Sequence, residues 1–196
     1  MPSILDMLST HLDENALAQL SSSVGADSGA TSKGIAAAIP VLLGALAHNA
    51  TQGDGAQKLN DALARDHDGS VLNDVAGAVR SGQVAQDGNA ILGHVLGDRR
   101  EVAEQAVAQA SGLDLSKAGP LLAMLAPVVM GALGRARQQG GLDATGLAGL
   151  LGGEREALGA AAPGVLGMVS RLLDRDHDGS ALNDVGAMLG GLLGKR

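Results

Sequence analysis

The chain contains no phenylalanine, tryptophan or tyrosine among its 196 residues. Without aromatic rings, the core has to be built from leucine, valine, isoleucine, methionine and alanine, which bury less area per side chain. Enough burial then requires many close contacts between helices. The 30 glycines agree with this requirement, because a residue without a side chain lets two backbones approach. The composition therefore predicts a tightly packed helical core with small residues at the crossings.

Apolar residues recur at helical spacing along the chain, and no segment alternates convincingly with a period of two. We therefore expect an all-α fold, a helical bundle. The expected helices cover about 3–12, 13–25, 27–47, 56–64, 70–80, 87–97, 98–111 and 114–138, with a short one around Leu147, one ending at Leu173 and a last one from Ser180.

One segment occurs twice. The sequence at 65–75, Arg-Asp-His-Asp-Gly-Ser-Val-Leu-Asn-Asp-Val, returns at 175–185 with Val71 replaced by Ala181. Pro40 and Pro127 also stand in matching contexts inside long expected helices, where proline removes a backbone hydrogen bond and should kink the helix. These matches predict two tandem, diverged repeats, each with a proline-kinked long helix and a helix–Asp-His-Asp-Gly-Ser loop–helix unit.

The repeats divide the chain into three parts. The first repeat covers residues 1–82, a bridging helix covers 83–97, and the second repeat covers 98–196 with a glycine-rich insertion at about 140–164. The sequence leaves open whether the two repeats form one domain or two.

The duplicated loop resembles a calcium-binding loop of the EF-hand type. In such loops alternate positions supply oxygen ligands and a glycine at position six permits a sharp turn. In the second copy Val185 replaces the usual glutamate at position twelve, and Asp184 is placed to reach back instead. In the first copy Ala64 stands at position one. The expected calcium ligands are Asp174, Asp176, Asp178, Ser180 and Asp184 in the second loop, and the smaller set Asp66, Asp68, Ser70 and Asp74 in the first.

The same loop also fits a plain helix junction. Gly69 and Gly179 would take the left-handed conformation that ends one helix, and Ser70 and Ser180 would cap the next. Asn73 and its counterpart in the second copy would complete the cap from the third helical position. This interpretation explains the glycine and the serine but not the crowded aspartates. His67 and its counterpart His177 are expected to face solvent.

No arrangement of residues indicates catalysis. His94 lies among apolar residues and is expected to be an interior or boundary histidine, whereas His11 and His48 are expected at exposed helix ends. The chain has no cysteine, which excludes thiolate chemistry and disulfides. We therefore expect no enzyme activity and no catalytic residues.

Two glycine-rich stretches have alternative interpretations. The stripe Gly186, Gly190 and Gly194 permits close helix approach, either within the bundle or between subunits. The run from Gly146 to Gly153 has a similar character. Both are candidate surfaces for self-association into a homo-oligomer.

Charge and hydropathy limit the partners. The net charge is −7 and no aromatic residue is present for base stacking, so nucleic acid is not an expected partner. No signal sequence and no stretch of about 20 apolar residues is evident, which predicts a soluble, cytoplasmic protein. Secretion by a route without an N-terminal signal stays open, and no protein partner can be named.

Several segments together resemble a bacterial protein family. They are the segment Asp-Gly-Asn-Ala-Ile-Leu-Gly-His-Val-Leu-Gly at 87–97, the block Met-Leu-Ala-Pro-Val-Val-Met-Gly-Ala-Leu at 124–133, and the two aspartate loops. In this combination the chain resembles the YidB-like family, domain of unknown function 937. The resemblance covers nearly the whole chain and implies an all-helical bacterial protein. It implies no activity and carries no catalytic residues across.

The sequence thus predicts a non-enzymatic structural or interaction protein with a calcium-type loop in the second repeat and a capacity for self-assembly. Two alternatives stay open. Short helices joined by tight turns also occur in DNA-associated helix-turn-helix proteins, and a helical bundle can hold a small ligand between its helices.

Overall fold

The computed structural model describes residues 3–161, which form nine α-helices and two short 3-10 helices with no strand in that range. The all-α prediction is confirmed for this part of the chain. The α-helices are α1 Ile4–His11, α2 Glu14–Val24, α3 Ser28–Ala50, α4 Gly55–Arg65, α5 Val75–Ser81, α6 Gln83–Val95, α7 Arg100–Ser111, α8 Leu115–Gly140 and α9 Ala144–Ala161. The 3-10 helices are η1 Ser70–Asn73 and η2 Gly97–Arg99.

Side-chain caps start several of these helices where the sequence predicts them. The side chains of Ser3, Asp13 and Asp27 accept backbone N–H groups in the first turns of α1, α2 and α3. α2 ends at Gly25 and α7 at Gly112, both with left-handed backbone, and each is followed by an aspartate at the start of a long helix. Asp114 makes no side-chain capping bond at the start of α8.

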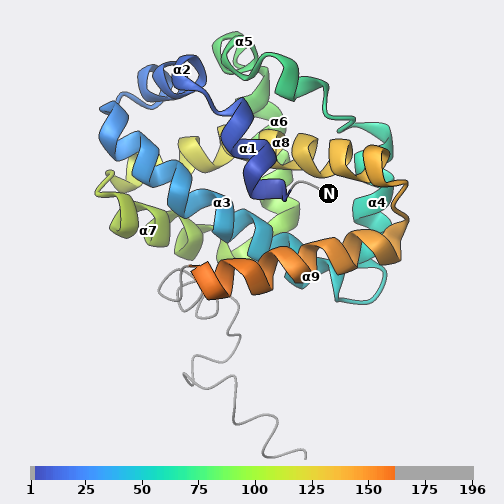
Figure 1. Cartoon of the computed structure of the whole chain (residues 1–196). Coiled ribbons are helices and arrows are strands. Elements are labelled where there is room, and N and C mark those ends of the chain that lie inside the picture. Colours follow the sequence, from blue (N-terminus) through green and yellow to red (C-terminus); the bar gives the residue numbers. More distant parts are fainter. Residues whose placement is uncertain (1–2, 162–196) are drawn as a thin grey trace, which may run out of the picture.

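The centre of the fold is helix α8, which packs against α1, α2, α3, α4, α6, α7 and η1 (Figure 1). Every residue from Leu121 to Gly134 is buried, so this helix is covered on all sides. α3 is the second core helix and is buried at every residue from Ala37 to Ala47. Pro40 lies inside α3, and Pro120 and Pro127 lie inside α8.

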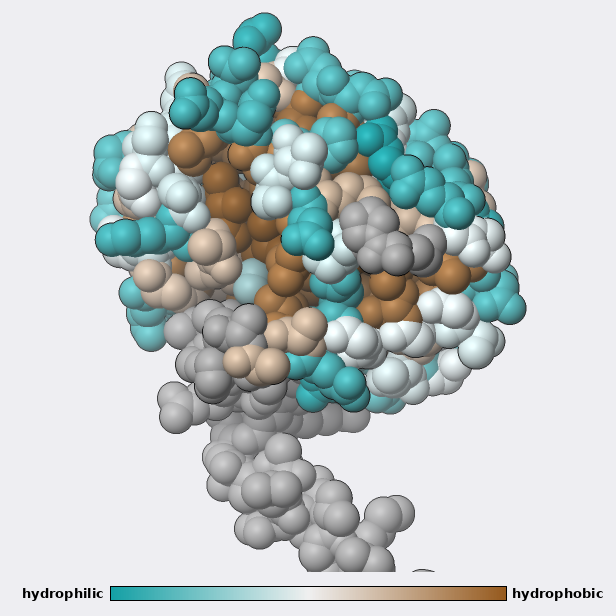
Figure 2. Space-filling model, in the orientation of Figure 1, coloured by the Kyte–Doolittle hydropathy of each residue, from teal (hydrophilic) through white to brown (hydrophobic). Residues whose placement is uncertain are grey.

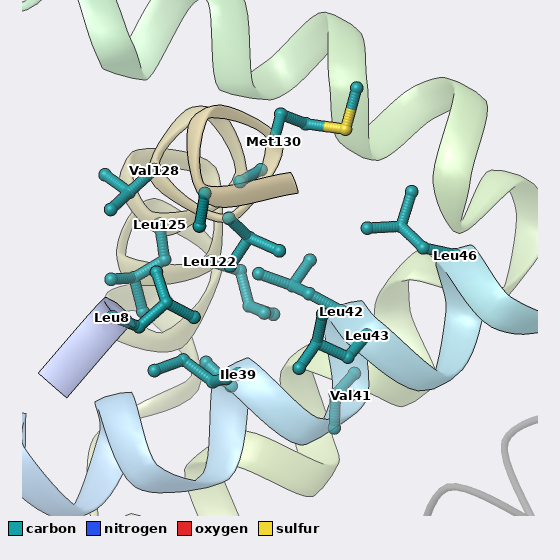
Figure 3. Close-up of a cluster of buried hydrophobic side chains, with 14 of the residues drawn as sticks. Leu8, Ile39, Val41, Leu42, Leu43, Leu46, Leu122, Leu125, Val128 and Met130 are labelled. Carbon is teal, nitrogen blue, oxygen red and sulfur yellow. The ribbon is translucent and has the colours of Figure 1, made fainter. Parts of the chain in front are cut away.

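The buried residues of the two long helices meet in one hydrophobic cluster that draws on both halves of the described chain. In Figure 3, Leu42 of α3 points toward Leu122 of α8, and Leu8 of α1 lies beside Leu125. On the face shown in Figure 2, hydrophobic residues gather over α3 and beside α1, and hydrophilic residues cover most of the rim. The core is aliphatic throughout, as the composition requires.

α3 and α8 correct one expectation from the sequence. Both are long and apolar enough, by length and composition, to cross a membrane. Within the fold, however, 72% of the apolar window of α3 and 89% of that of α8 is buried. Their hydropathy therefore matches their position as the core helices of the bundle.

The glycine-rich insertion differs most from expectation. In place of a short helix around Leu147, the structure has α9, which runs to Ala161 and packs against α3 and α4. Leu147 and Leu151 are fully buried, whereas Gly149, Gly152 and Gly153 of the same run are exposed. Burial of leucines on one side of α9 outweighs the low helix propensity of its glycines.

A buried carboxylate ties α9 to the start of the chain. Glu154 Oε1 accepts the backbone N–H of Ile4 at 2.9 Å, in the first turn of α1. The side chain of Glu154 is buried and lies at the N-terminus of that helix. This bond connects the last described helix to the first.

The closest backbone approach in the core is between α6 and α8. A Cβ atom on Gly88 would overlap the carbonyl oxygen of Ala123. Gly88 is buried, whereas Gly93 on the same helix is exposed and a Cβ there would meet nothing within 4 Å. The two glycines therefore have opposite tolerance for a side chain.

We predict that Gly88→Ala destabilises the fold by about 1–3 kcal/mol, because α6 must move away from α8. Gly93→Ala is the matched control and should stabilise by about 0.5–1 kcal/mol through its higher helix propensity. Urea unfolding followed by circular dichroism measures both. Equal effects of the two substitutions would contradict the close approach of α6 and α8.

Candidate functional site

The first aspartate loop, residues 66–74, joins α4 to α5 and lies against the C-terminal half of α8. Asp66 ends α4, and its carboxylate pairs with Arg65 at 2.7 Å. This ion pair lowers the pKa of Asp66. Gly69 has a φ of 93°, the left-handed conformation expected for the glycine of the loop.

The other two aspartates of the loop bind backbone N–H groups. Asp68 Oδ1 accepts the N–H of Ser70 at 2.9 Å, and its hydrogen bonds with Ser70 lower its pKa. Asp74 Oδ1 accepts the N–H of Gly77 at 2.7 Å and so caps α5. Within residues 3–161, no group of three or more histidine, cysteine, aspartate or glutamate side chains lies close enough to hold a metal ion. The carboxylates of Asp68 and Asp74 thus serve as turn and cap acceptors, and that of Asp66 pairs with Arg65.

The exit from the loop corrects the expected helix from residue 70 to 80. It is divided into η1 and α5, with Asp74 between them as the N-cap. Ser70 makes no side-chain cap, and Asn73 does not complete one. The Asn73 Oδ1 atom instead accepts a hydrogen bond from Arg135 of α8 at 2.7 Å.

Arg135 is the residue that holds the loop on α8. One guanidinium nitrogen, Nη2, donates to the carbonyl of Gly69 at 2.8 Å as well as to Asn73, and Nη1 lies 3.2 Å from Nε2 of His11 in α1. Gln138 adds a bond from Nε2 to the carbonyl of Asp68 at 3.0 Å. The loop, α1 and α8 therefore meet at one guanidinium group.

Glycines on α8 make room for this contact. A Cβ on Gly134 would overlap the carbonyl oxygen of His67, and one on Gly131 would lie 2.5 Å from Cγ1 of Val71. The loop backbone therefore rests directly on the backbone of α8. The sequence does not predict this docking, because nothing in the sequence around the glycines and Arg135 of α8 indicates which segment packs on them.

His67 is half-buried rather than solvent-facing, which corrects its prediction. It lines two neighbouring hollows, and Asp66 and Asp87 line both as well. The larger is a cleft of about 890 Å³ lined by residues of α3, α4 and α6, with Met130 of α8 among them. Ala62, Ile91 and Val95 give the cleft an apolar part.

The other histidines also differ in part from expectation. His94 is exposed and lines the cleft, so the interior or boundary position predicted for it is wrong. His11 and His48 lie in the last turns of α1 and α3 as expected, but both are half-buried. Burial, with Arg99 and Arg155 nearby, lowers the pKa of His48.

The second aspartate loop, with Asp174, Asp176, Asp178, Ser180 and Asp184, lies outside the described residues, as do His177 and the stripe Gly186, Gly190 and Gly194.

The fold and the docked loop define a helical bundle protein with one aliphatic core. A family model described as "Bacterial protein of unknown function (DUF937)" matches residues 6–136, more than half of the chain. The chain belongs to this family, which confirms the resemblance seen in the sequence. No curated protein and no solved structure matches the chain.

We predict that Arg135→Ala destabilises the protein by about 1–3 kcal/mol, because the Gly69 carbonyl and Asn73 lose their charged donor. Arg135→Lys should recover only part of this loss, since one ammonium nitrogen cannot reach both the loop and His11 as the two guanidinium nitrogens do. Urea unfolding gives the free energies. An Arg135→Ala variant as stable as the wild type would show that Arg135 does not hold the loop on α8.

A second prediction concerns pH. Burial lowers the pKa of His67 below its ordinary value of 6.5, while Asp66 and Asp87 oppose the shift. The folded state then binds the proton less readily than the unfolded state. The stability from neutral His67 is therefore present above pH 6.5 and is lost as the pH falls through the lower, folded pKa.

His67→Gln should accordingly reduce the fall in Tm between about pH 7.5 and about pH 5. His48→Gln in the same chain should reduce it further, because burial lowers the pKa of His48 as well. Thermal unfolding at a series of pH values measures both effects. An unchanged pH slope in His67→Gln would show that protonation of this side chain is not linked to folding.

Proposed function

We propose that the protein is a non-enzymatic structural or interaction module built from two diverged repeats, in which the aspartate loops act as helix junctions. The observation that carries this proposal is the docking of the first loop on α8 through Arg135 and Gly134. It ties a local turn to the central helix of the core.

Reciprocal packing supports the repeats. If α1, α2 and α3 correspond to α6, α7 and α8, then contacts in one half should recur in the other. α2 packs on α8 and α7 packs on α3, and α1 packs on α8 as α6 does on α3, although the extensive contact between α6 and α8 has no comparable counterpart between α1 and α3. α3 of the first repeat packs on α7 and α8 of the second, and α8 packs on α1 and α2 of the first, which favours one intertwined domain.

The positions of α3 that correspond to Gly134 and Arg135 of α8 carry different residues. The sequence match between the long helices places Ala47 and His48 of α3 opposite Gly134 and Arg135 of α8. Alanine carries the Cβ that Gly134 must lack, and histidine cannot supply the arginine fork. The second loop instead has Asp174 where the first has Ala64, which adds a carboxylate at position one.

A divalent cation of the calcium type would therefore stiffen the second junction, where the first is held by α8. The ligands would be Asp174, Asp176 and Asp178, with Ser180 and Asp184. A flexible oxygen-rich loop suits calcium better than magnesium, which demands a rigid octahedral shell.

Calorimetry with calcium tests this proposal. Wild-type protein should bind calcium and gain about 2.7 kcal/mol of stability at 100 times the Kd. Asp176→Ala should abolish binding, and Asp66→Ala, the matched change in the first loop, should leave it intact. No heat and no shift in Tm at millimolar calcium would refute the cation and leave both loops as capped turns.

A second candidate function is binding of a small cationic ligand in the α4–α6 cleft. Lys58 pairs with Asp54 and Arg65 with Asp66 at its rim, so Asp87 gives the cleft net negative charge beside its apolar lining. Titration with a short alkylammonium ion, followed by the NMR signal of His67, tests it. Binding that survives Asp87→Asn, or no binding at all, would refute this candidate.

A further inference from the structure

Two neighbouring hollows meet at the first aspartate loop. The first is the α4–α6 cleft of about 890 Å³, and the second, of about 480 Å³, is lined by the loop, by α5 and by the start of α6. Asp66, His67 and Asp87 line both hollows. The two hollows are therefore adjoining parts of one depression in the surface.

Helix α6 provides one wall of this depression along most of its length. Val84 lines the second hollow, Asp87 lines both, and Ile91 and Val95 line the first. These residues follow one another at spacings of three or four, so they lie on one side of the helix. At 1.5 Å per residue, the wall from Asp87 to Val95 is about 12 Å long. The first hollow is therefore elongated enough to hold an extended chain of several carbon atoms.

The first hollow is apolar on both of its helical walls. Leu59 and Ala62 of α4 and Ile91 of α6 line it, and each is only half-buried. The lysine and the arginine that also line it are each paired with an aspartate. Half-buried apolar side chains on facing walls favour a ligand that removes them from water.

The second hollow is lined by carboxylates. The described residues that line it include no lysine or arginine, and its carboxylates are those of Asp66, Asp68, Asp74 and Asp87. Asp68 and Asp74 accept backbone N–H groups, which do not neutralise their charge. None of the four ion pairs within residues 3–161 includes Asp87. The potential at the junction of the two hollows therefore favours a positive charge.

This positive charge is better supplied by an organic cation than by a metal ion. In the described part of the chain, no three histidine, cysteine, aspartate or glutamate side chains lie close enough together to hold a metal ion. An ammonium group needs no such converging set, because it can donate to one carboxylate while the others attract it at longer range. A cation at Asp87 beside an apolar wall implies a ligand that is charged at one end and apolar along its length.

We propose that the two hollows form one site for an unbranched alkylammonium ion, with its ammonium group at Asp87 and its alkyl chain along α6 toward Val95. This proposal rests on the cation binding at Asp87 proposed above and adds the class of ligand. The chain lies between α4 and α6, where Ala62 and Ile91 cover it.

Calorimetry on the full chain tests the proposal with methylammonium, butylammonium, hexylammonium and octylammonium, and the NMR signal of His67 reports whether binding occurs at this site. Affinity should rise about two- to fourfold with each added methylene, where fourfold corresponds to complete burial. Octanoate and octanol carry a similar chain without the positive charge. Both should bind about tenfold or more weakly than octylammonium, because they lack the charged donor to Asp87.

Substitutions separate the two parts of the site. Asp87→Asn should weaken binding of every ion in the series, whereas Ile91→Gln should remove the gain with chain length and leave methylammonium binding unchanged. Asp61→Asn is the matched control and should change neither, because Asp61 is exposed on α4 and lines neither hollow. If Ile91→Gln does not fold, Ala62→Gln on the facing wall decides between the same outcomes.

Each contrary result has a distinct meaning. Equal affinity for all chain lengths would overturn the ligand class and leave the cation site at Asp87 intact. No binding of any ion, or binding that Asp87→Asn leaves unchanged, would overturn both proposals. Octanol that binds as tightly as octylammonium would show an apolar cleft that does not recognise charge, and would overturn the alkylammonium site.

Discussion

The fold depends on direct contact between backbones in a core that has no aromatic rings. Leucines, valines and alanines fill the space between α3 and α8. These side chains are small, so glycines at the helix crossings let the main chains come close enough to complete the packing. Gly88 lets α6 rest on Ala123 of α8, and Gly34 lets α3 approach Leu113 and Leu121. These close crossings explain how an aliphatic chain surrounds one helix on every side.

The same constraint positions the first aspartate loop. Its carboxylates satisfy the backbone groups that two helix ends leave open, and Gly134 lets the loop main chain lie on α8. Arg135 then supplies charged donors to the Gly69 carbonyl and to Asn73. The loop is thereby attached to the central helix α8, and His11 of α1 contacts the same arginine.

Much of the fold could be predicted because it depends on local signals. Asp13 and Asp27 cap helices and Gly25 ends one, since each acts within a single turn of chain. The features that could not be predicted depend on distant partners. α9 is helical because Leu147 and Leu151 are buried by other elements, and the bond of Glu154 to the backbone of Ile4 joins residues 150 positions apart.

In the candidate site, too, the local features could be predicted and the contacts with distant elements could not. The glycine turn at Gly69 follows from its sequence, whereas the packing of η1 on α8 does not. His67 alternates with aspartates in the sequence and so looks solvent-facing, yet it is half-buried where the loop docks on α8. Spacing along the chain indicates which atoms are available, but only packing decides what they bind.

Amide hydrogen exchange of residues 66–74 tests most directly whether α8, and not a cation, holds the first loop. The account predicts equal protection of these amides in EDTA and in calcium, and its loss in Gly134→Ala, where a Cβ would push the His67 carbonyl off the helix. Protection that appears only with calcium, or that survives Gly134→Ala unchanged, would contradict it.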